Sequence, residues 1–436
     1  MSSAKLSQKS VALTAVAATA ASLGLAACAK SGNSGAAPSK NSTLVIGLFD
    51  PFSGPDAIFG QEMVPPCEAA VKVINAAGGV LGHKLACKVV DTRGDPADAV
   101  PAARQMIATT PNLVGVIGPS SDEMDATAPI INAAHIPFVT VSGEPSFNHT
   151  HLQYYWRNTP SDDATGYALA ARAIALHYTR GAAVFGNDIN AQANVPGLLA
   201  SYPKAGRKLV INLQLAPTQS SYQTEVSRVI AAHPDVIFSE ADSQTSATFF
   251  GEYKQLNGGK LPPIIVTNVG MQPDWYRSVS GVIGKPMMTD ISGVQTYASF
   301  TGPAYQAYKS AMLSLTNVKN VQQYFTNTYV MSYYDNVIMF AIAMRAAKSV
   351  NPVVWNSYIA RVTQTGGGVP VHTFAEAAAK LPGTKVDYVG AIGEQSFNQW
   401  HNSSGGFEVA QWLPNGQLKQ TAIITSAQIS ALQSGG

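Results

Sequence analysis

Short apolar runs alternate with stretches of helical pattern along most of this chain, and that alternation leaves few folds open to it. In the first half, each run is rich in β-branched residues and ends at turn-forming or polar residues, as buried strands do. The strands expected there are 43–49, 84–90, 114–118 and 137–142. Because strands separated in this way by helices need parallel crossover connections, we predict a doubly wound α/β lobe.

The same alternation begins again at Pro160-Ser161-Asp162, which is typical of a helix start. Further strands are predicted at 182–185, 209–213, 236–239 and 264–267. A chain of 436 residues is long enough for two lobes, so a second α/β lobe is expected. A long helix over 329–349 follows it.

The first helix is expected over 65–77, with Gly78 and Gly79 as its stop. Pro65 and Pro66 would then lie in its first turn. A missing N–H costs little at that position, because the first turn has no helical partner for it.

Charge and motifs exclude two large classes of function. The chain has 28 Lys and Arg against 26 Asp and Glu, without a run of basic residues, whereas binding nucleic-acid phosphates needs a concentrated basic surface. The sequence has no G-x-S-x-G, H-E-x-x-H, Walker-type or C-x-x-C motif. His149 and His151 form a close pair, but a metal site needs a further ligand. We therefore predict no catalysis, no cofactor, no metal and no nucleic-acid partner.

The first 28 residues have the order of an export signal. A polar start with Lys5 and Lys9 precedes an apolar stretch, which ends in Leu25-Ala26-Ala27 before Cys28. This ending resembles the lipobox of bacterial lipoproteins, which implies a signal peptide over 1–27 and a diacylglyceryl group on Cys28. A weak membrane anchor is the alternative, since the apolar stretch of 17 residues is at the low end for a bilayer span.

Residues 28–42 have almost no apolar content and read as a flexible tether. Such a coil would hold the folded part roughly 20 Å from the lipid on average. We therefore expect a protein tethered to the outer side of the cytoplasmic membrane or present in the periplasm.

Two cysteines remain once Cys28 is assigned to lipidation, namely Cys67 and Cys87. In an oxidising compartment an isolated pair favours a disulfide, here between the first helix and the strand after it. Two buried free thiols are the alternative.

Ile74-Asn-Ala-Ala-Gly-Gly-Val-Leu-Gly82 resembles a characteristic string of the leucine-isoleucine-valine-binding-protein family, the extracytoplasmic solute-binding components of ABC importers. Shorter matches follow in order at Val116 to Ser121, Trp156-Arg157, Tyr334-Asp335 and Asn415-Gly416. The resemblance implies the type I periplasmic-binding-protein fold, in which two α/β lobes joined by three crossing segments close on a ligand. It divides the chain into lobe 1 (43–158 and 292–366) and lobe 2 (159–291 and 367–436).

In lobe 1, Ser120 and Ser121 follow a strand and open a helix, so their hydroxyls and the helix N–H groups are suited to a carboxylate. The resemblance assigns Ser120 to the ligand carboxylate, and a helix cap is the alternative. Further ligand-binding candidates implied by the family pattern are Phe59, Ser142, Gly143 and Glu144. Glu144 stands where the family has a hydroxyl residue and is suited to a cationic group or to solvent.

In lobe 2 the match is weaker. The family has an acid for the ligand's amino group where this chain has 266–270, and the chain has none there. If the solute is zwitterionic, Glu240, Asp242 or Glu144 must supply that charge. Asn187, Asp242 and Asn268 follow predicted strands and are candidate ligand-binding residues, and Tyr329 is expected at the edge of the cleft.

We therefore predict a lipid-anchored solute-binding protein of an ABC importer, which captures a small polar or amino-acid-like solute and binds the permease subunits. Two alternatives remain: a ligand sensor of the same fold that acts on a regulatory partner, and a hydrolase of small amides.

Overall fold

The computed structural model describes residues 42–54, 57–403 and 405–434. The predicted signal peptide, the lipidation site Cys28 and nearly all of the predicted tether lie outside these residues. Within the described ranges, no helix combines the length and apolar character that a membrane crossing requires.

The first sheet has five parallel strands in the order β2-β1-β3-β4-β5. They are β1 (Leu44–Asp50), β2 (Leu85–Asp91), β3 (Leu113–Ile117), β4 (Phe138–Thr140) and β5 (Tyr155–Arg157). All four strands predicted for the first half are present. The strand order reverses direction between β1 and β3, and ligands of open α/β sheets bind beyond the carboxyl ends of strands at such a point.

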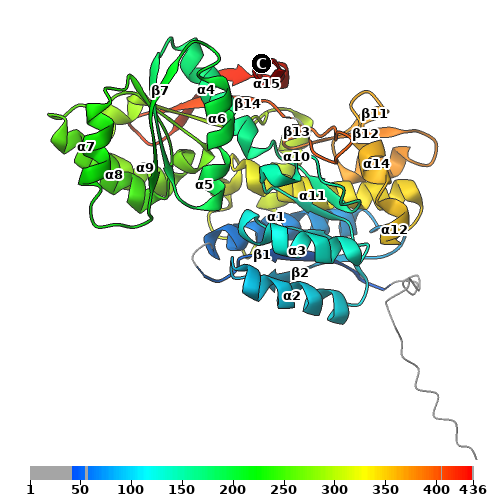
Figure 1. Ribbon diagram of the computed structural model, residues 1–436. Coiled ribbons are helices and arrows are strands. Elements are labelled where there is room, and N and C mark those ends of the chain that lie inside the picture. Colours follow the sequence, from blue (N-terminus) through cyan, green and yellow to red (C-terminus); the bar gives the residue numbers. More distant parts are fainter. Residues whose placement is uncertain (1–41, 55–56, 404, 435–436) are drawn as a thin grey trace, which may run out of the picture. The chain divides into compact units, whose positions relative to one another are not determined.

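Helices cover both faces of this sheet (Figure 1). The main ones are α1 (Ala57–Ala76), α2 (Pro96–Thr109), α3 (Ser121–Ala133) and α11 (Thr328–Ala347). Leu44, Ile46 and Leu48 of β1 share a core with α1 and α11, whereas Phe49 shares the other core with α2 and α3. Successive strand residues point to opposite faces, so one apolar strand supplies both cores.

A small third sheet has the order β11-β12-β13 and packs on the core of α1 and α11. This part of the chain contains β11 (Val369–Val371), β12 (Val386–Gly390), β13 (Gly393–Glu394), α10 (Gly302–Leu313), η4 (Val321–Tyr324), α12 (Pro352–Trp355), α13 (Tyr358–Val362) and α14 (Phe374–Lys380). Val371, Val386 and Tyr388 are buried in that core.

The second large sheet has seven strands in the order β15-β14-β10-β9-β8-β6-β7. They are β6 (Arg180–Gly186), β7 (Lys208–Leu215), β8 (Val236–Glu240), β9 (Ile264–Val266), β10 (Ile291–Thr296), β14 (Phe407–Trp412) and β15 (Leu418–Ile424). The strands from β10 to β7 are parallel, and β14 and β15 are antiparallel additions.

Helices also lie on both faces of the second sheet (Figure 1). They are α4 (Asp162–Ala175), α5 (Ile189–Ala193), α6 (Val195–Ser201), α7 (Gln223–Ala231), α8 (Ser243–Leu256), α9 (Pro273–Ile283) and α15 (Ser426–Ser434), with the short helices η2 (Asn268–Met271) and η3 (Lys285–Asp290). The short helix η1 (Pro145–Phe147) belongs to the first sheet, where Phe147 joins the core of α2 and α3. One core joins α7, α8 and α9, and the other joins α4, α6 and α15. The predicted α/β fold with two doubly wound sheets is confirmed.

The pairing of strands differs from the predicted division of the chain at two places. Residues 292–296 belong to β10, which pairs with β9 and β14 of the second sheet, although we assigned them to lobe 1. Residues 369–394 form the small sheet on the core of α1 and α11, although we assigned them to lobe 2. The lobe boundaries themselves remain a proposal.

Helix α1 begins at Ala57, so Pro65 and Pro66 lie in its interior. Our prediction that they lie in its first turn is wrong. Each interior proline removes a backbone hydrogen bond, at a cost of about 3 kcal/mol. The helix continues because both sides of the proline pair are anchored in the core, through fully buried residues such as Met63 and Cys67.

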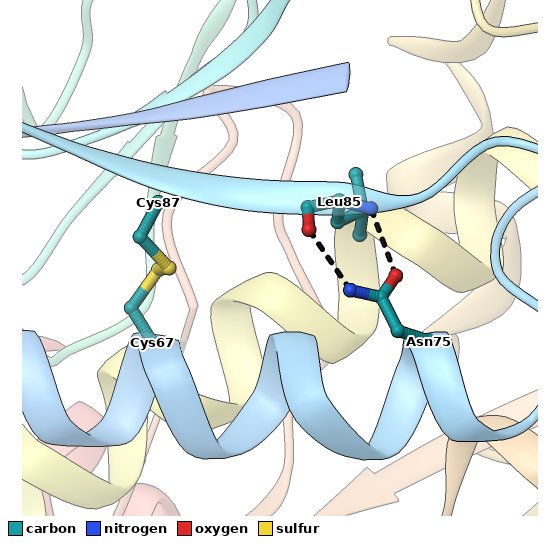
Figure 2. Close-up of a disulfide and its surroundings, with 4 residues drawn as sticks. All are labelled: Cys67, Asn75, Leu85 and Cys87. Carbon is teal, nitrogen blue, oxygen red and sulfur yellow. Dashed lines mark hydrogen bonds between the residues drawn. A yellow bond between two sulfur atoms is a disulfide. The ribbon is translucent and has the colours of Figure 1, made fainter. Parts of the chain in front are cut away.

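A disulfide between Cys67 and Cys87 joins α1 to β2, the arrangement that the cysteine count favoured (Figure 2). About two helical turns further along α1, the Asn75 side chain forms two hydrogen bonds with the backbone of Leu85. Its amide donates to the Leu85 carbonyl at 3.0 Å, and its oxygen accepts from the Leu85 N–H at 2.8 Å. These contacts fix the second half of α1 against β2.

Candidate functional site

A pocket lies at the carboxyl end of β10, beside the starts of α4 and α11. Its lining residues are Thr159, Pro160, Asp162, Thr165, Asn268, Val294, Gln295, Thr296, Thr328, Tyr329 and Phe407. Hydroxyl and amide groups predominate, and Asp162 is the one charged residue in this lining. We call this site the Asp162 pocket. Its free volume of about 10 Å³ has room for roughly one water molecule, so a solute requires the surrounding residues to move apart.

Asp162 is the first residue of α4, and its backbone N–H donates to the carbonyl of Gly143 at 2.7 Å. Its side chain lies so close to Gly143 that a Cβ at that position would come within 1.9 Å of the carboxylate. The Oδ2 atom is enclosed and has no hydrogen-bond partner. Burial, and next the like charge of Glu240, raise the pKa of Asp162 well above its ordinary value, and Arg157 opposes that rise.

Glu240 ends β8 and is 4% exposed. Its Oε1 accepts from Asn190 Nδ2 at 3.1 Å, its Oε2 accepts from Asn194 Nδ2 at 3.1 Å, and the Thr267 hydroxyl also donates to Oε2. Burial raises the pKa of Glu240 to about 7 in spite of these donors, and the like charge of Asp188 adds to the rise. Glu240 is therefore a buried carboxyl group that is bound by neutral donors alone and that acts electrostatically on Asp162.

Aromatic rings connect the Asp162 pocket to the first sheet. The Phe59 ring meets the Tyr329 ring edge to face at 6.2 Å and the Tyr333 ring at 6.3 Å. Tyr329 lines the pocket, and the Phe59 ring contacts it.

At the carboxyl end of β1, the Tyr333 hydroxyl donates to the buried Asp50 carboxylate at 2.9 Å. At the start of α3, the Ser120 hydroxyl donates to Glu123 Oε2 at 2.7 Å, and Thr92 donates to the other oxygen at 2.7 Å. Burial, and to a smaller extent Glu123, raise the pKa of Asp50 well above its ordinary value. The switch point of the first sheet therefore already contains two buried acids.

Ser121 and Ser142 share a hydrogen bond between their hydroxyls at 2.9 Å. The next residue, Gly143, is the one that contacts Asp162. The loop after β4 therefore contacts both the start of α3, through Ser142 and Ser121, and the start of α4, through Gly143 and Asp162.

Glu144 is half-buried, and its Oε1 accepts weakly from the Ser146 N–H at 3.5 Å. Its Oε2 is enclosed and unpaired. Burial raises the pKa of Glu144. Arg157 directs its two terminal nitrogens elsewhere, to the Glu144 carbonyl at 2.9 Å and to Asn148 Oδ1 at 2.6 Å.

The structure brings together several of the predicted residues and leaves others apart. Asn268 lines the Asp162 pocket and Gly143 contacts Asp162. Asn187 is exposed at the end of β6, and Asp242 is exposed and accepts from the N–H groups of Gln244 and Thr245 as the cap of α8. These two lie outside the lining of the pocket.

Sequence reasoning missed Asp162 as a site residue, although it recognised the helix start in which Asp162 lies. It also missed Gln295 and Thr296, because β10 has too few apolar residues to be recognised as a strand. The available signal for Asp162 was its position at a helix start that follows a strand and a loop. Such helix starts lie at the carboxyl edge of a sheet, where ligands bind.

A larger cavity of about 150 Å³ lies at the other ends of β9 and β10. It is lined by Arg172, Leu176, Tyr178, Pro263, Ile264, Ile265, Thr289, Asp290, Ser292 and Gln411. It contains none of the predicted site residues and lies away from the carboxyl ends, where this fold class binds ligands. In the part of the chain that the structure describes, no three His, Cys, Asp or Glu side chains gather as a metal site would require.

Curated relatives match parts of the chain. A Leu/Ile/Val-binding protein, BraC3, of Rhizobium johnstonii is 24% identical over 206 residues, which cover 46% of this chain and 55% of the relative. An amino acid binding protein of Pseudomonas aeruginosa is 25% identical over 198 residues, covering 45% and 53%. A Leu/Ile/Val-binding protein homolog 3 of Brucella melitensis is 42% identical over 64 residues, or 17% of its length. The chain thus aligns with at most about half of each of these relatives.

Solved structures share the fold over most of the chain. The branched-chain amino acid transporter substrate binding protein LivJ from Streptococcus pneumoniae, in complex with isoleucine, has a TM-score of 0.69 at 17% identity and covers 88% of this chain and 99% of its own. A solute binding protein of an ABC transporter from Rhodopseudomonas palustris, in complex with p-hydroxybenzoic acid, has a TM-score of 0.69 at 16% identity, covering 88% and 97%. A sequence model described as periplasmic binding protein matches residues 43–417. The chain therefore belongs to the periplasmic binding protein family.

Proposed function

We propose that this protein is the extracytoplasmic solute-binding component of an ABC importer and that it captures a small polar or amino-acid-like solute without altering it. The family match over residues 43–417 supports the class of function. The observation that carries the proposal is the Asp162 pocket, a polar pocket lined by α4, β10 and α11 at the carboxyl edge of a sheet.

In this proposal the residues around the pocket separate to admit the solute and close on it. Hydroxyl and amide side chains of the lining, among them Thr165, Asn268 and Thr296, exchange their hydrogen bonds with water for bonds to the solute. The Phe59 and Tyr329 rings exclude water from one side. A lipid on Cys28 and the tether of residues 28–42 would keep the protein near the permease subunits.

A solute screen by thermal unfolding tests the proposal, because a ligand bound by the folded form alone raises the unfolding temperature by mass action. The full chain is screened against amino acids, short amides, amines and aromatic acids, and hits are confirmed by calorimetry. We expect saturable binding of at least one small solute, which is recovered chemically unchanged. Consumption of the solute would identify an enzyme instead, and the absence of any hit would contradict the proposal.

Gly143→Ala links such a hit to the Asp162 pocket. The new Cβ would meet the Asp162 carboxylate at 1.9 Å and must displace it, so we expect at least tenfold weaker binding, equivalent to about 1.4 kcal/mol. Gly383→Ala is the matched control, since a Cβ there has no neighbour within 4 Å. Equal affinities of the two variants would place the solute elsewhere.

A further inference from the structure

We propose that the solute of the Asp162 pocket carries a net positive charge, as an amine, amidine or guanidine, and is not held by a carboxylate. This inference rests on the proposed function and specifies its substrate class. It departs from what the family resemblance implied for Ser120.

The charges around the pocket are the first observation. Asp162 is in the lining, no Lys, Arg or His is, and Glu240 and Glu144 are close enough to influence Asp162 electrostatically. Arg157 is the cation that acts on Asp162. Asp163 acts on Asp162 as a further like charge. The four carboxyl groups outnumber the one guanidinium, so the region has no surplus positive charge for an anionic solute, whereas a cationic solute would favour the ionised forms of these acids.

Unpaired carboxylate oxygens are the second, independent observation. Asp162 Oδ2 and Glu144 Oε2 are both enclosed without a hydrogen-bond partner. Buried oxygens of this kind almost always have a donor. Arg157 does not supply it: its terminal nitrogens donate to the Glu144 carbonyl and to Asn148, and its Nε–H is enclosed without bonding to either carboxyl oxygen. A solute with N–H donors and a positive charge would supply both the hydrogen-bond donor and the opposite charge that Asp162 lacks.

The lobe 1 side of the site is the third observation. The hydroxyl protons of Ser120 and Tyr333 are donated to Glu123 and Asp50, so these hydroxyl oxygens can only accept further hydrogen bonds. Glu123 in the first turn of α3 also provides the negative charge that the N-terminus of a helix favours. The hydroxyls of Ser120 and Tyr333 are thus not available as donors to a carboxylate.

Aromatic surface next to these acids agrees with a cation. Tyr329 lines the pocket, with Phe59 and Tyr333 behind it. Ammonium and guanidinium groups bind favourably over the faces of such rings. A carboxylate gains nothing from this contact.

Three probes of equal chain length test the proposal by calorimetry on the full chain: 1,4-diaminobutane, the neutral 1,4-butanediol and the anion succinate, with agmatine and leucine added. We expect the two cations to bind and the diol, succinate and leucine to bind at least tenfold more weakly. Tighter binding of succinate, leucine or the diol would overturn the inference while leaving the proposed function intact. If none of these probes, and no solute of the wider screen, binds, both fail.

The variant Asp162→Asn tests whether the Asp162 carboxylate is the group that binds the positive charge of the solute. Loss of one charge-assisted hydrogen bond should weaken binding of the cationic probe by about 10- to 100-fold. Asp163→Asn is the control, because Asp163 is the next residue of α4, does not line the pocket and has the smallest influence on Asp162 among the neighbouring charges; we expect less than about a threefold effect from its screened charge. Glu144→Gln provides a second variant if Asp162→Asn unfolds. Unchanged affinity in a folded Asp162→Asn protein would refute the assignment.

Discussion

Glu240→Gln should make the protein's stability less dependent on pH, because it removes a buried carboxyl group while preserving its shape. Glu240 is 4% exposed and is bound by Asn190, Asn194 and Thr267. All three side chains donate to it, and no cation is bonded to it. Deprotonation in the folded state therefore places a negative charge in a region that neutral donors only partly compensate.

The size of the effect follows from the pKa of Glu240, which burial raises from an ordinary value of 4.5 to about 7. Between these two values the folded protein retains a proton that the unfolded chain has lost, so the free energy of unfolding falls as the pH rises through this window and is level above it. The difference corresponds to roughly 3 kcal/mol. Glutamine does not titrate, although its amide must turn an N–H toward one of the donors, at a cost of about 1 kcal/mol at every pH.

Urea unfolding of the wild type and of Glu240→Gln, followed by circular dichroism between about pH 4.5 and 8, measures this effect. The stability of the variant relative to the wild type should rise by roughly 3 kcal/mol from the acid to the neutral end. Asp242→Asn is the control, since that acid is exposed two residues further on and asparagine caps a helix equally well. A difference between Glu240→Gln and wild type that stays constant with pH would refute the argument that burial controls Glu240.

Two further predictions concern the first sheet and its helices. Replacing Cys67 and Cys87 by serine should lower the free energy of unfolding by about 3 kcal/mol, because the bridge closes a loop between residues 20 positions apart; an unchanged urea midpoint would count against it. Tyr333→Phe leaves the buried Asp50 carboxylate without its hydroxyl donor and should cost about 1–3 kcal/mol. Asp50→Asn in the same chain should recover part of this loss in thermal unfolding, and no recovery would trace the loss to ring packing instead.

Several of the strands that were predicted from the sequence have a continuous apolar run because both of their faces are buried. Residues 44–50 and 236–240 are examples, buried almost throughout. In contrast, β10 has the sequence Ile-Ser-Gly-Val-Gln-Thr and is buried because β9 and β14 pair with it on either side. A strand of that composition becomes recognisable only when its neighbours are known, which is why the predicted division of the chain failed to place residues 292–296 in the second sheet.

Local signals predicted which residues lie at the carboxyl edge of the first sheet. Ser121 and Ser142 follow strands, and the carboxyl ends of parallel strands share one edge of a sheet. The structure accordingly places their hydroxyls 2.9 Å apart. Asp162 was recognised as part of a helix start, but its role depends on contact with Gly143 and on the proximity of Glu240, neither of which has a local signal.

The electrostatic character of the site is a property of the fold and not of the composition. The whole chain has a formal charge of +2, yet Asp162, Glu144 and Glu240 come from separate stretches of the sequence and influence one another in the interior. The backbone motifs that resemble the family specify strand ends and helix starts, which many solutes can use. Which solute binds at the carboxyl edge of a sheet depends on the charged side chains that other parts of the chain place there. In the proposal of a cationic solute, these acidic groups, and the Ser120 hydroxyl that donates to Glu123, take the place of the carboxylate-binding role that the family resemblance implied.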